Sequence, residues 1–161
     1  MSQIDQVLTS LRRVIRAIDL HSKQLVKTVS VTGPQLRLLQ LIRREGDATA
    51  SELSEAMSLS QATVTSILDR LEDRGLLERI RSQTDKRKIH PRLTETGSRL
   101  LDQAPTPLQD SFVRKFDQLQ SWEQHMIIAS LQRLAEMMDA EDIDASPYLD
   151  LGSLDRTIEK E

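Results

Sequence analysis

Five basic residues lie within residues 79–88, whose sequence is RIRSQTDKRK, and a single acid, Asp85, lies among them. Lysines and arginines at this density suit a row of phosphates, because each contact with DNA releases condensed counterions. Asp85 stands two residues before Arg87, so its carboxylate can hold that guanidinium in a bidentate pair and fix its direction. In isolation such a charge run is more often a solvated turn, so its meaning depends on the elements that present it.

The positive charge is a local feature of an acidic chain. The 161 residues carry a formal charge of −3, yet residues 74–92 hold seven lysines and arginines against two acids. Residues 136–161 have the opposite bias, with nine acids and two basic residues. The charge of the whole chain is therefore a poor guide to its partners, and the basic segment has to be interpreted separately.

The composition excludes several kinds of function. The chain has no cysteine, which removes disulfides, thiolate metal sites and thiol-based sensing. Its three histidines fall on separate predicted elements without metal-ligand spacing, and no enzyme nucleophile, phosphate-loop or metalloprotease motif occurs. No apolar run approaches the roughly 20 residues of a membrane span, and the first residues do not resemble a signal peptide. We therefore expect no enzyme, metal, cofactor or membrane contact, in a cytoplasmic protein.

Helical periodicity dominates the first part of the chain. Apolar residues recur every three or four positions over residues 4–29 and predict one long amphipathic helix with a wide apolar stripe. Thr32 and Gln35 have the spacing of a capping box and predict a second helix, which Gly46 ends.

The next two predicted helices have the spacing of a helix-turn-helix. A capping box that starts at Thr49 opens the first, and Ser60 caps the second, which stops at Gly75. A short turn at residues 58–60 separates them. The side chains expected to face the core are Leu53, Ala56, Met57, Val64, Ile67, Leu68 and Leu71.

A basic hairpin follows at once. Residues 76–82 and 88–94 predict two antiparallel strands around the polar loop SQTDK, and Pro91 confines the second strand to an edge. A helix-turn-helix followed by such a hairpin is a winged helix. The expected fold class is therefore mainly α with a small β-hairpin wing.

A helical pattern interrupted by proline comes next. Thr94 caps a helix that Pro105 and Pro107 interrupt, so we expect a break at residues 103–107.

Two further helices are expected, over residues 108–119 and 122–139, and the second is opened by a capping box of Ser121 and Gln124. The acidic end from Ala140 onward is weakly patterned. The side chains expected inside the last helix are Met126, Ile127, Leu131, Leu134 and Met138.

Residues 52–97, with the sequence ELSEAMSLSQATVTSILDRLEDRGLLERIRSQTDKRKIHPRLTETG, resemble the MarR family of bacterial transcription regulators. The strongest similarities are LDRLEDRGLLER, the Asp-x-Arg of TDKR and the LTETG that opens the next helix. Many helix-turn-helix units have glycine where this chain has Ser58. The resemblance extends over roughly residues 4–140 and implies an obligate homodimer with two winged-helix lobes.

The resemblance implies a division of the chain into four parts. These are an N-terminal dimerisation helix (1–31), a winged helix-turn-helix DNA-binding domain (32–97), C-terminal dimerisation helices (98–140) and an acidic tail (141–161). The stretches RAIDLHSKQL and TGPQLRLLQ look like the subgroup that controls ectoine and other compatible-solute genes.

The winged helix predicts how DNA is contacted. The first residues of helix 60–75 should meet base edges in the major groove, and the absence of arginine from its first turn favours A·T-leaning sites. The hairpin should follow the backbone, with Arg87 in a narrow minor groove, held by Asp85. The predicted DNA-binding residues are Ser60, Gln61, Ala62, Thr63, Thr65, Ser66, Arg70, Arg79, Arg81, Asp85, Lys86, Arg87 and Lys88.

The expected function is that of a dimeric, sequence-specific transcriptional regulator, a repressor on a pseudo-palindromic operator of double-stranded DNA. The resemblance implies release by a small-molecule effector or an osmotic signal, with Arg16, His21, Lys23 and Arg37 as candidate ligand-binding residues. The alternative is a winged-helix protein-interaction adaptor without sequence-specific DNA binding. The retained Asp-x-Arg pair favours DNA.

Overall fold

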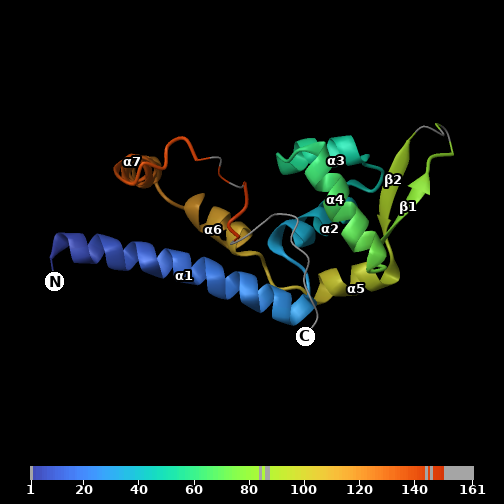
Figure 1. Ribbon diagram of the computed structural model, residues 1–161, viewed down its shortest axis with the longest axis horizontal. Coiled ribbons are helices and arrows are strands. Elements are labelled where there is room, and N and C mark those ends of the chain that lie inside the picture. The colour runs from blue at the N-terminus through green and yellow to red at the C-terminus, as the bar shows by residue number, and fades with distance from the viewer. Residues whose placement is uncertain (1, 84, 86–87, 144, 146, 151–161) are drawn as a thin grey trace. The chain divides into compact units, whose positions relative to one another are not determined.

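The computed structural model describes residues 2–83, 85, 88–143, 145 and 147–150 (Figure 1). Within these residues the chain forms seven helices and two strands. Their bounds, in chain order, are α1 Gln3–Val29, α2 Gly33–Glu45, α3 Ala50–Met57, α4 Gln61–Asp73, β1 Leu77–Arg81, β2 Ile89–Leu93, α5 Glu95–Gln103, α6 Leu108–Phe116 and α7 Ser121–Met137.

The elements fall into two units. The described residues up to Pro105, together with Pro147–Asp150, form the winged-helix unit, which contains α1 to α5 and the hairpin. The described residues of 106–146 form the C-terminal unit, which contains α6 and α7. The chain thus leaves the winged-helix unit after α5 and returns to it beyond α7.

Side-chain caps fix where the first helices begin. The Thr32 hydroxyl accepts a hydrogen bond from the Gln35 amide, while the Gln35 side chain accepts one from the Thr32 amide, so the predicted capping box is confirmed. The same reciprocal pair joins Thr49 and Glu52 at the start of α3. The Thr49 amide and hydroxyl both donate to the Glu52 carboxylate and lower its pKa.

The turn before α4 has the predicted position. Ser58 follows α3 in the left-handed region, at φ 53°, where glycine is the commoner residue. Ser60 then caps α4 by accepting a hydrogen bond from the Thr63 amide at 3.1 Å. Gly75, at φ 68°, follows the end of α4, as the sequence predicted.

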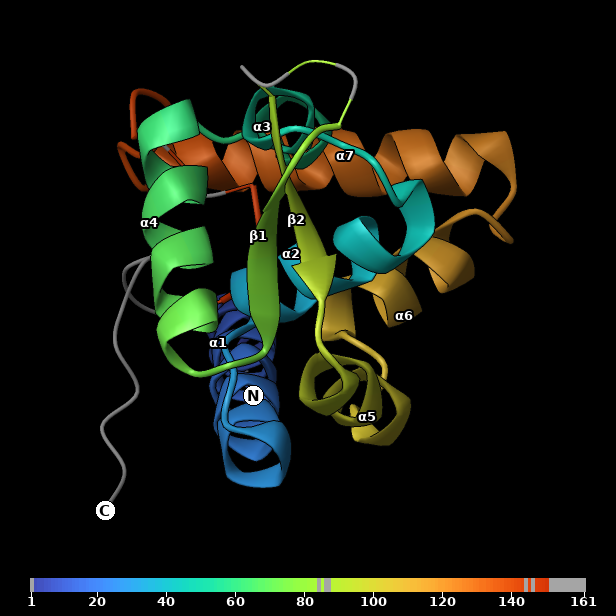
Figure 2. The same cartoon turned by 90° about the vertical axis from the view of Figure 1, so that its right-hand side faces the viewer.

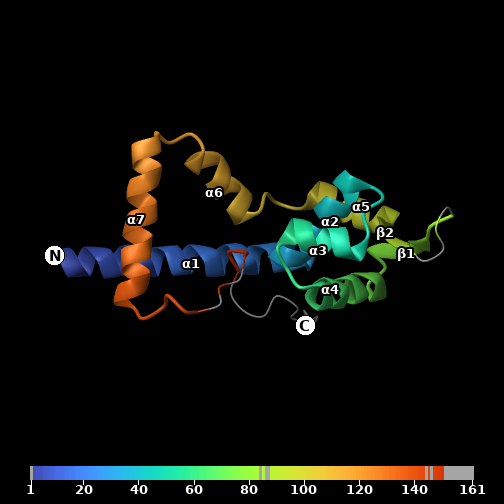
Figure 3. The ribbon, with the colours of Figure 1, turned by 90° about the horizontal axis from the view of Figure 1, so that it is seen from above.

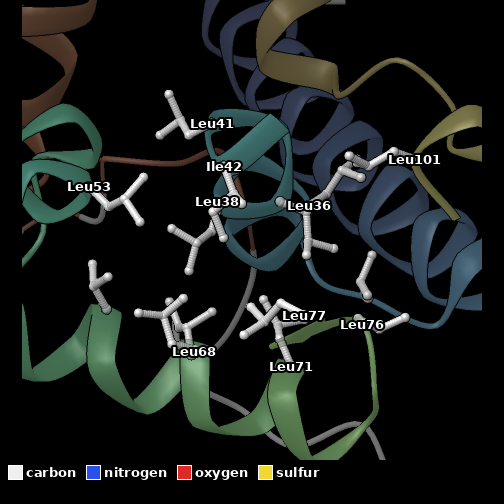
Figure 4. Close-up of a cluster of buried hydrophobic side chains, with 14 of the residues drawn as sticks. Leu36, Leu38, Leu41, Ile42, Leu53, Leu68, Leu71, Leu76, Leu77 and Leu101 are labelled. Carbon is white, nitrogen blue, oxygen red and sulfur yellow. The ribbon is translucent and has the colours of Figure 1, made fainter. Parts of the chain in front are cut away.

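The core of the winged-helix unit lies between α2 and α4. Leu36 and Leu38 of α2 are almost completely buried and lie across from Leu68 and Leu71 of α4, while Leu41, also buried, points away from α4 (Figure 4). Burying one such leucine stabilises a fold by about 1.5–3 kcal/mol. Additional buried core residues from the other elements include Leu53, Met57, Leu76, Leu77 and Leu101.

The prediction that Ala56 faces the core is wrong. Ala56 is exposed, because the inward arc of the short helix α3 runs through Leu53, Ser54 and Met57 and leaves Ala56 at its outer edge. Ser54 is buried there, and its hydroxyl donates to the Ser51 carbonyl at 2.7 Å.

The two predicted strands pair as an antiparallel hairpin. Leu77 is opposite Leu93 and Arg81 is opposite Ile89, so the predicted wing is confirmed. β1 packs against α4, while β2 packs against α2, α3 and α5. Figure 2 shows that α4 begins at the end of the unit where the hairpin has its tip, and that its last turn leads into β1.

The start of α5 lies unusually close to the chain before β1. Thr94 caps α5, its hydroxyl donates to the Gly75 carbonyl at 2.7 Å, and its amide donates to the Leu76 carbonyl at 3.2 Å. A Cβ on Gly97 would lie 1.9 Å from the Leu76 carbonyl oxygen. Only glycine fits this contact, which ties α5 to the base of the wing.

The predicted break is present, since α5 ends at Gln103, Ala104 is extended and α6 begins at Leu108. In the C-terminal unit, α6 ends at Phe116 rather than residue 119, and a turn joins it to α7 (Figure 3).

The cap of α7 differs from the predicted one. It is formed by Gln120 and Glu123, one residue earlier than the predicted Ser121 and Gln124. The side chain of Gln124 is used elsewhere, since it donates to the Phe116 carbonyl at 2.9 Å.

The expectation that α7 buries an apolar face is wrong for the single chain. No described residue of α6 or α7 is buried, and Met126 and Leu131 are 55% and 58% exposed. Two helices alone offer too little surface to cover these side chains.

The segment Pro147–Asp150 packs on the winged-helix unit. The Tyr148 ring lies against the core, and its hydroxyl donates to the Met57 carbonyl, at the end of α3, at 3.1 Å. Burial raises the pKa of Tyr148, and the nearby charge of Arg37 opposes that shift.

Candidate nucleic-acid interface

The exposed face of α4 forms the first half of the candidate interface. A shallow hollow on this face is lined by Gln61, Ala62, Thr65 and Ser66, with Asp69 and Arg70 one turn further on. Among the predicted contacts, Ser60 and Thr63 are partly engaged in the cap, since their hydroxyls lie 2.8 Å apart. The structure therefore brings most of the predicted helix residues together on one surface.

That surface is chemically suited to base edges. Gln61, Ala62 and Thr65 are exposed, so an amide, a methyl group and a hydroxyl are all accessible. A glutamine amide can pair with adenine at two points, while methyl groups of alanine and threonine can contact the thymine methyl.

The hairpin forms the second half. A hollow of about 460 Å³ on one face of the wing is lined by Arg81, Lys88, His90 and Arg92, together with Ser82, Gln83, Asp47, Asp85 and Ile80. Arg81 and Lys88 are exposed and have no ion-pair partner among the described residues. Two of the predicted phosphate contacts thus line the same hollow as His90.

Arg92 has a partner at the base of this hollow. Its guanidinium forms an ion pair with Asp47, which lies in the connection between α2 and α3. This contact joins the outer strand of the wing to the helix-turn-helix over a sequence distance of 45 residues.

Two hydrogen bonds join the described residues near the end of the hairpin. The Lys88 amide donates to the Asp85 carbonyl at 2.9 Å, and the Asp85 amide donates to the Ser82 hydroxyl at 3.2 Å. Lys86 and Arg87, with the predicted pairing of Asp85 and Arg87, lie outside the described residues. Their roles remain predictions.

Arg79 is the exception among the predicted phosphate contacts. Its guanidinium donates to the Asp69 carboxylate at 2.6 Å and to the Glu72 carboxylate at 2.7 Å, and its side chain is only 27% exposed. The residue on β1 is therefore bound to two acids of α4.

The four candidate ligand-binding residues lie on α1 and α2. Arg16 and Lys23 both pair with Asp19, at 2.7 and 3.0 Å, and His21 is exposed. Arg37, on α2, is partly exposed near Tyr148. None of the four lines either of the two hollows described above.

Three acids belong to this interface that were not among the predicted site residues. Asp47 holds Arg92, while Asp69 and Glu72 hold Arg79. The spacing of Asp69 and Glu72 on one helix face, just before a cationic strand, is a signal that could have identified the second set. For Asp47 the sequence carries no comparable signal.

Neither metal binding nor membrane insertion is indicated in the part of the chain that the structure describes. It contains no group of three or more histidine or acidic side chains arranged to hold a metal ion. None of its helices is both long enough and apolar enough to span a bilayer.

Comparison with known proteins connects this geometry to one family. Residues 31–89 match the family described as MarR family. The HTH-type transcriptional regulator YsmB of Bacillus subtilis (strain 168) is 27% identical over 138 residues, which are 86% of this chain and 94% of that protein. This relative is named as a regulator and not as an enzyme, in agreement with the expectation from the sequence.

Solved structures share the fold. A MepR-like protein complexed with pseudoligands has a TM-score of 0.58 and 22% identity, over 86% of this chain and 97% of that chain. A mutant of S. aureus MepR bound to an oligodeoxyribonucleotide has a TM-score of 0.50 and 18% identity, over 86% of this chain and 99% of that chain. At these identities the likeness concerns the fold, and it confirms the predicted mainly helical winged helix.

Proposed function

We propose that this chain, which belongs to the MarR family of transcriptional regulators, is a homodimeric repressor that binds a pseudo-palindromic operator in double-stranded DNA. The observation that carries the proposal is the pairing, on one unit, of a polar helix face with a cationic hairpin. α4 begins at the end of the unit where the hairpin has its tip, so both surfaces can meet one duplex (Figure 2). We place the protein in the cytoplasm, where bacterial DNA is.

In this proposal α4 enters the major groove. Gln61, Ala62 and Thr65 contact base edges, while Ser60, Thr63 and Ser66 contact bases or phosphates near the start of the helix. Arg70 lies at the rim of the same hollow and contacts the backbone. An operator with A·T pairs opposite Gln61 fits this set of side chains.

The wing supplies the electrostatic part. Arg81 and Lys88 contact phosphates directly, which the exposure of both side chains supports. From the sequence, Lys86 joins them and Arg87, oriented by Asp85, enters the minor groove. Arg79 has a different part, because its guanidinium is already paired with two acids of α4.

The apolar surface supports a homodimer. On α1, Ile4, Val7 and Val14 are 67%, 50% and 58% exposed, and on α7 Trp122 and Met137 are 65% and 71% exposed. Monomeric proteins rarely leave so many large apolar side chains in water. A second copy, through first and last helices, covers them. Light scattering at micromolar concentration should give twice the chain mass, and a monomer would contradict this part of the proposal.

A second part of the proposal is that an effector controls DNA binding. We infer a small-molecule or osmotic signal, with control of compatible-solute genes, from the similarity of residues 16–25 and 32–40 to that subgroup. Arg16, His21, Lys23 and Arg37 remain the residues proposed to meet a ligand. Titration of potassium into an operator complex tests the osmotic variant, since phosphate contacts weaken steeply with salt.

The central test is a selection of bound fragments from the source genome, run in parallel with wild type and a Gln61→Ala, Thr65→Ala double variant. The result expected is a small set of promoters that share a palindrome, with the preference blurred in the variant while bulk DNA affinity is kept. Enrichment of no fragment by wild type at any salt concentration would favour the protein-interaction adaptor instead.

A further inference from the structure

Arg79 occupies an unusual place for a wing cation. It lies on β1 opposite Pro91, and its guanidinium contacts Asp69 and Glu72, which stand one turn apart on α4. Both contacts are short, at 2.6 and 2.7 Å, which is typical of charge-assisted hydrogen bonds. The planar guanidinium can satisfy two carboxylates at once, which a lysine ammonium does less well.

The two acids present a problem that this contact solves. Asp69 lines the hollow on α4 beside Thr65 and Ser66, so its carboxylate faces the side from which DNA approaches. Its side chain is 54% exposed and that of Glu72 is 36% exposed. An uncompensated carboxylate here would repel phosphates and weaken any contact made by the same helix face.

The contact also fixes the wing relative to α4. β1 packs along α4, and the two ion pairs of Arg79 add polar side-chain contacts between them. The hairpin is also held at its base, where Thr94 donates to the Gly75 carbonyl, and on β2, where Arg92 pairs with Asp47. A rigid angle between helix and wing matters because both must meet one duplex at the same time.

We propose that Arg79 is a positioning residue for DNA binding, which neutralises Asp69 and Glu72 and fixes the wing to the recognition helix, and that it does not contact phosphate. This role rests on the proposed function, since it concerns the same DNA surface. It reassigns one of the cations that the sequence predicted as a backbone contact.

The test compares four proteins: wild type, Arg79→Met, the triple variant Arg79→Met with Asp69→Asn and Glu72→Gln, and the control Arg99→Met. The control removes an arginine from the exposed pair with Glu95 on α5, at 2.6 Å, away from both hollows. For each protein, the dissociation constant for a selected operator is measured at several salt concentrations, and the melting temperature is measured without DNA.

Arg79→Met should bind the operator about tenfold more weakly, because two carboxylates lose their partner. The triple variant should recover to within about threefold of wild type with the same salt slope, because no charge is left uncompensated. Arg99→Met should match wild type. If Arg79→Met unfolds at too low a temperature for its DNA binding to be measured, the affinity of the triple variant still tests the role of Arg79, since this variant lacks the unpaired acids.

Two binding results would overturn the role. A triple variant as weak as Arg79→Met, with a salt slope reduced by about 2 for the two copies in a dimer, means that Arg79 contacts phosphate. An Arg79→Met protein that binds like wild type means that the contact has no part in DNA binding.

The proposed function can fail separately. If wild type selects no DNA, the regulator proposal fails, while the melting temperatures still test the contact. In that case a melting temperature lowered in Arg79→Met and restored in the triple variant supports the neutralisation of the two acids by Arg79, and no restoration refutes it.

Discussion

Replacing Gly97 by alanine should destabilise the winged-helix unit more than its small size suggests. The added Cβ would lie 1.9 Å from the Leu76 carbonyl oxygen and 3.0 Å from its carbonyl carbon. A normal carbon–oxygen contact requires more than 3 Å, so α5 and the start of the wing must separate by about 1.3 Å. Leu76 is only 3% exposed, so neither side can yield without disturbing the core.

The cost follows from what the separation breaks. Overpacking of this kind costs about 1–3 kcal/mol. The two hydrogen bonds from Thr94, to Gly75 at 2.7 Å and to Leu76 at 3.2 Å, would weaken at about 0.5–1.5 kcal/mol each. A total near 3 kcal/mol should lower the melting temperature by about 10 °C for a chain of this length.

The melting temperature of Gly97→Ala is measured by circular dichroism during heating, with Gly33→Ala as the control. Gly33 also lies in the first turn of a helix, but a Cβ there meets only the Asp150 carboxylate, at the ordinary contact distance of 3.9 Å. Gly33→Ala should melt within about 2 °C of wild type. If Gly97→Ala melts with it, the close approach of α5 to Leu76 does not constrain the fold and the argument is refuted.

Three further predictions use other contacts. Because hydrogen bonds from Thr49 depress the pKa of Glu52, its contribution to stability is present above its ordinary value of 4.5 and is lost as the pH falls through the lower folded value. The melting temperature should therefore fall more between about pH 6 and about pH 3.5 for wild type than for Glu52→Gln. Tyr148→Phe should lower the free energy of unfolding by about 1 kcal/mol, because the hydrogen bond to the Met57 carbonyl is lost. Hydrogen exchange of the backbone amides that follow Met57 should become about fivefold faster, and unchanged exchange would contradict a stabilising role for this hydrogen bond. Arg92→Ala should leave the salt slope of DNA binding unchanged, since its guanidinium is already paired, and a slope lower by about 2 would contradict this.

Local signals in the sequence predicted the helix starts well. The boxes at Thr32 and Thr49, and the cap at Ser60, need only side chains three residues apart, so their outcome depends little on the rest of the fold. The break before α6 follows equally from proline chemistry. The predicted cap of α7 was wrong by one residue, because Gln120 with Glu123 forms the capping box in place of Ser121 with Gln124.

The partners of charged side chains could not be predicted in the same way. Arg92 meets Asp47 across 45 residues, and only the folded hairpin brings the two together. The prediction of a buried face on α7 also failed, because none of its apolar side chains is buried among the residues that the structure describes. A sequence pattern shows that such a face is amphipathic, but it does not show whether the same chain or another copy buries it.

The ion pairs change what the basic segment can contribute to DNA binding. If every wing cation touched a phosphate, Arg79, Arg81, Arg92 and the three residues of 86–88 would give twelve contacts per dimer and a share of the salt slope near −11. Arg79 and Arg92 are held by acids, so at most eight contacts remain and the share falls to about −7. In the proposed complex, two of the six cations orient the wing instead of contacting phosphate. A cationic run should therefore be judged by which side chains the fold leaves unpaired, because orientation and counterion release are supplied by different arginines of the same hairpin.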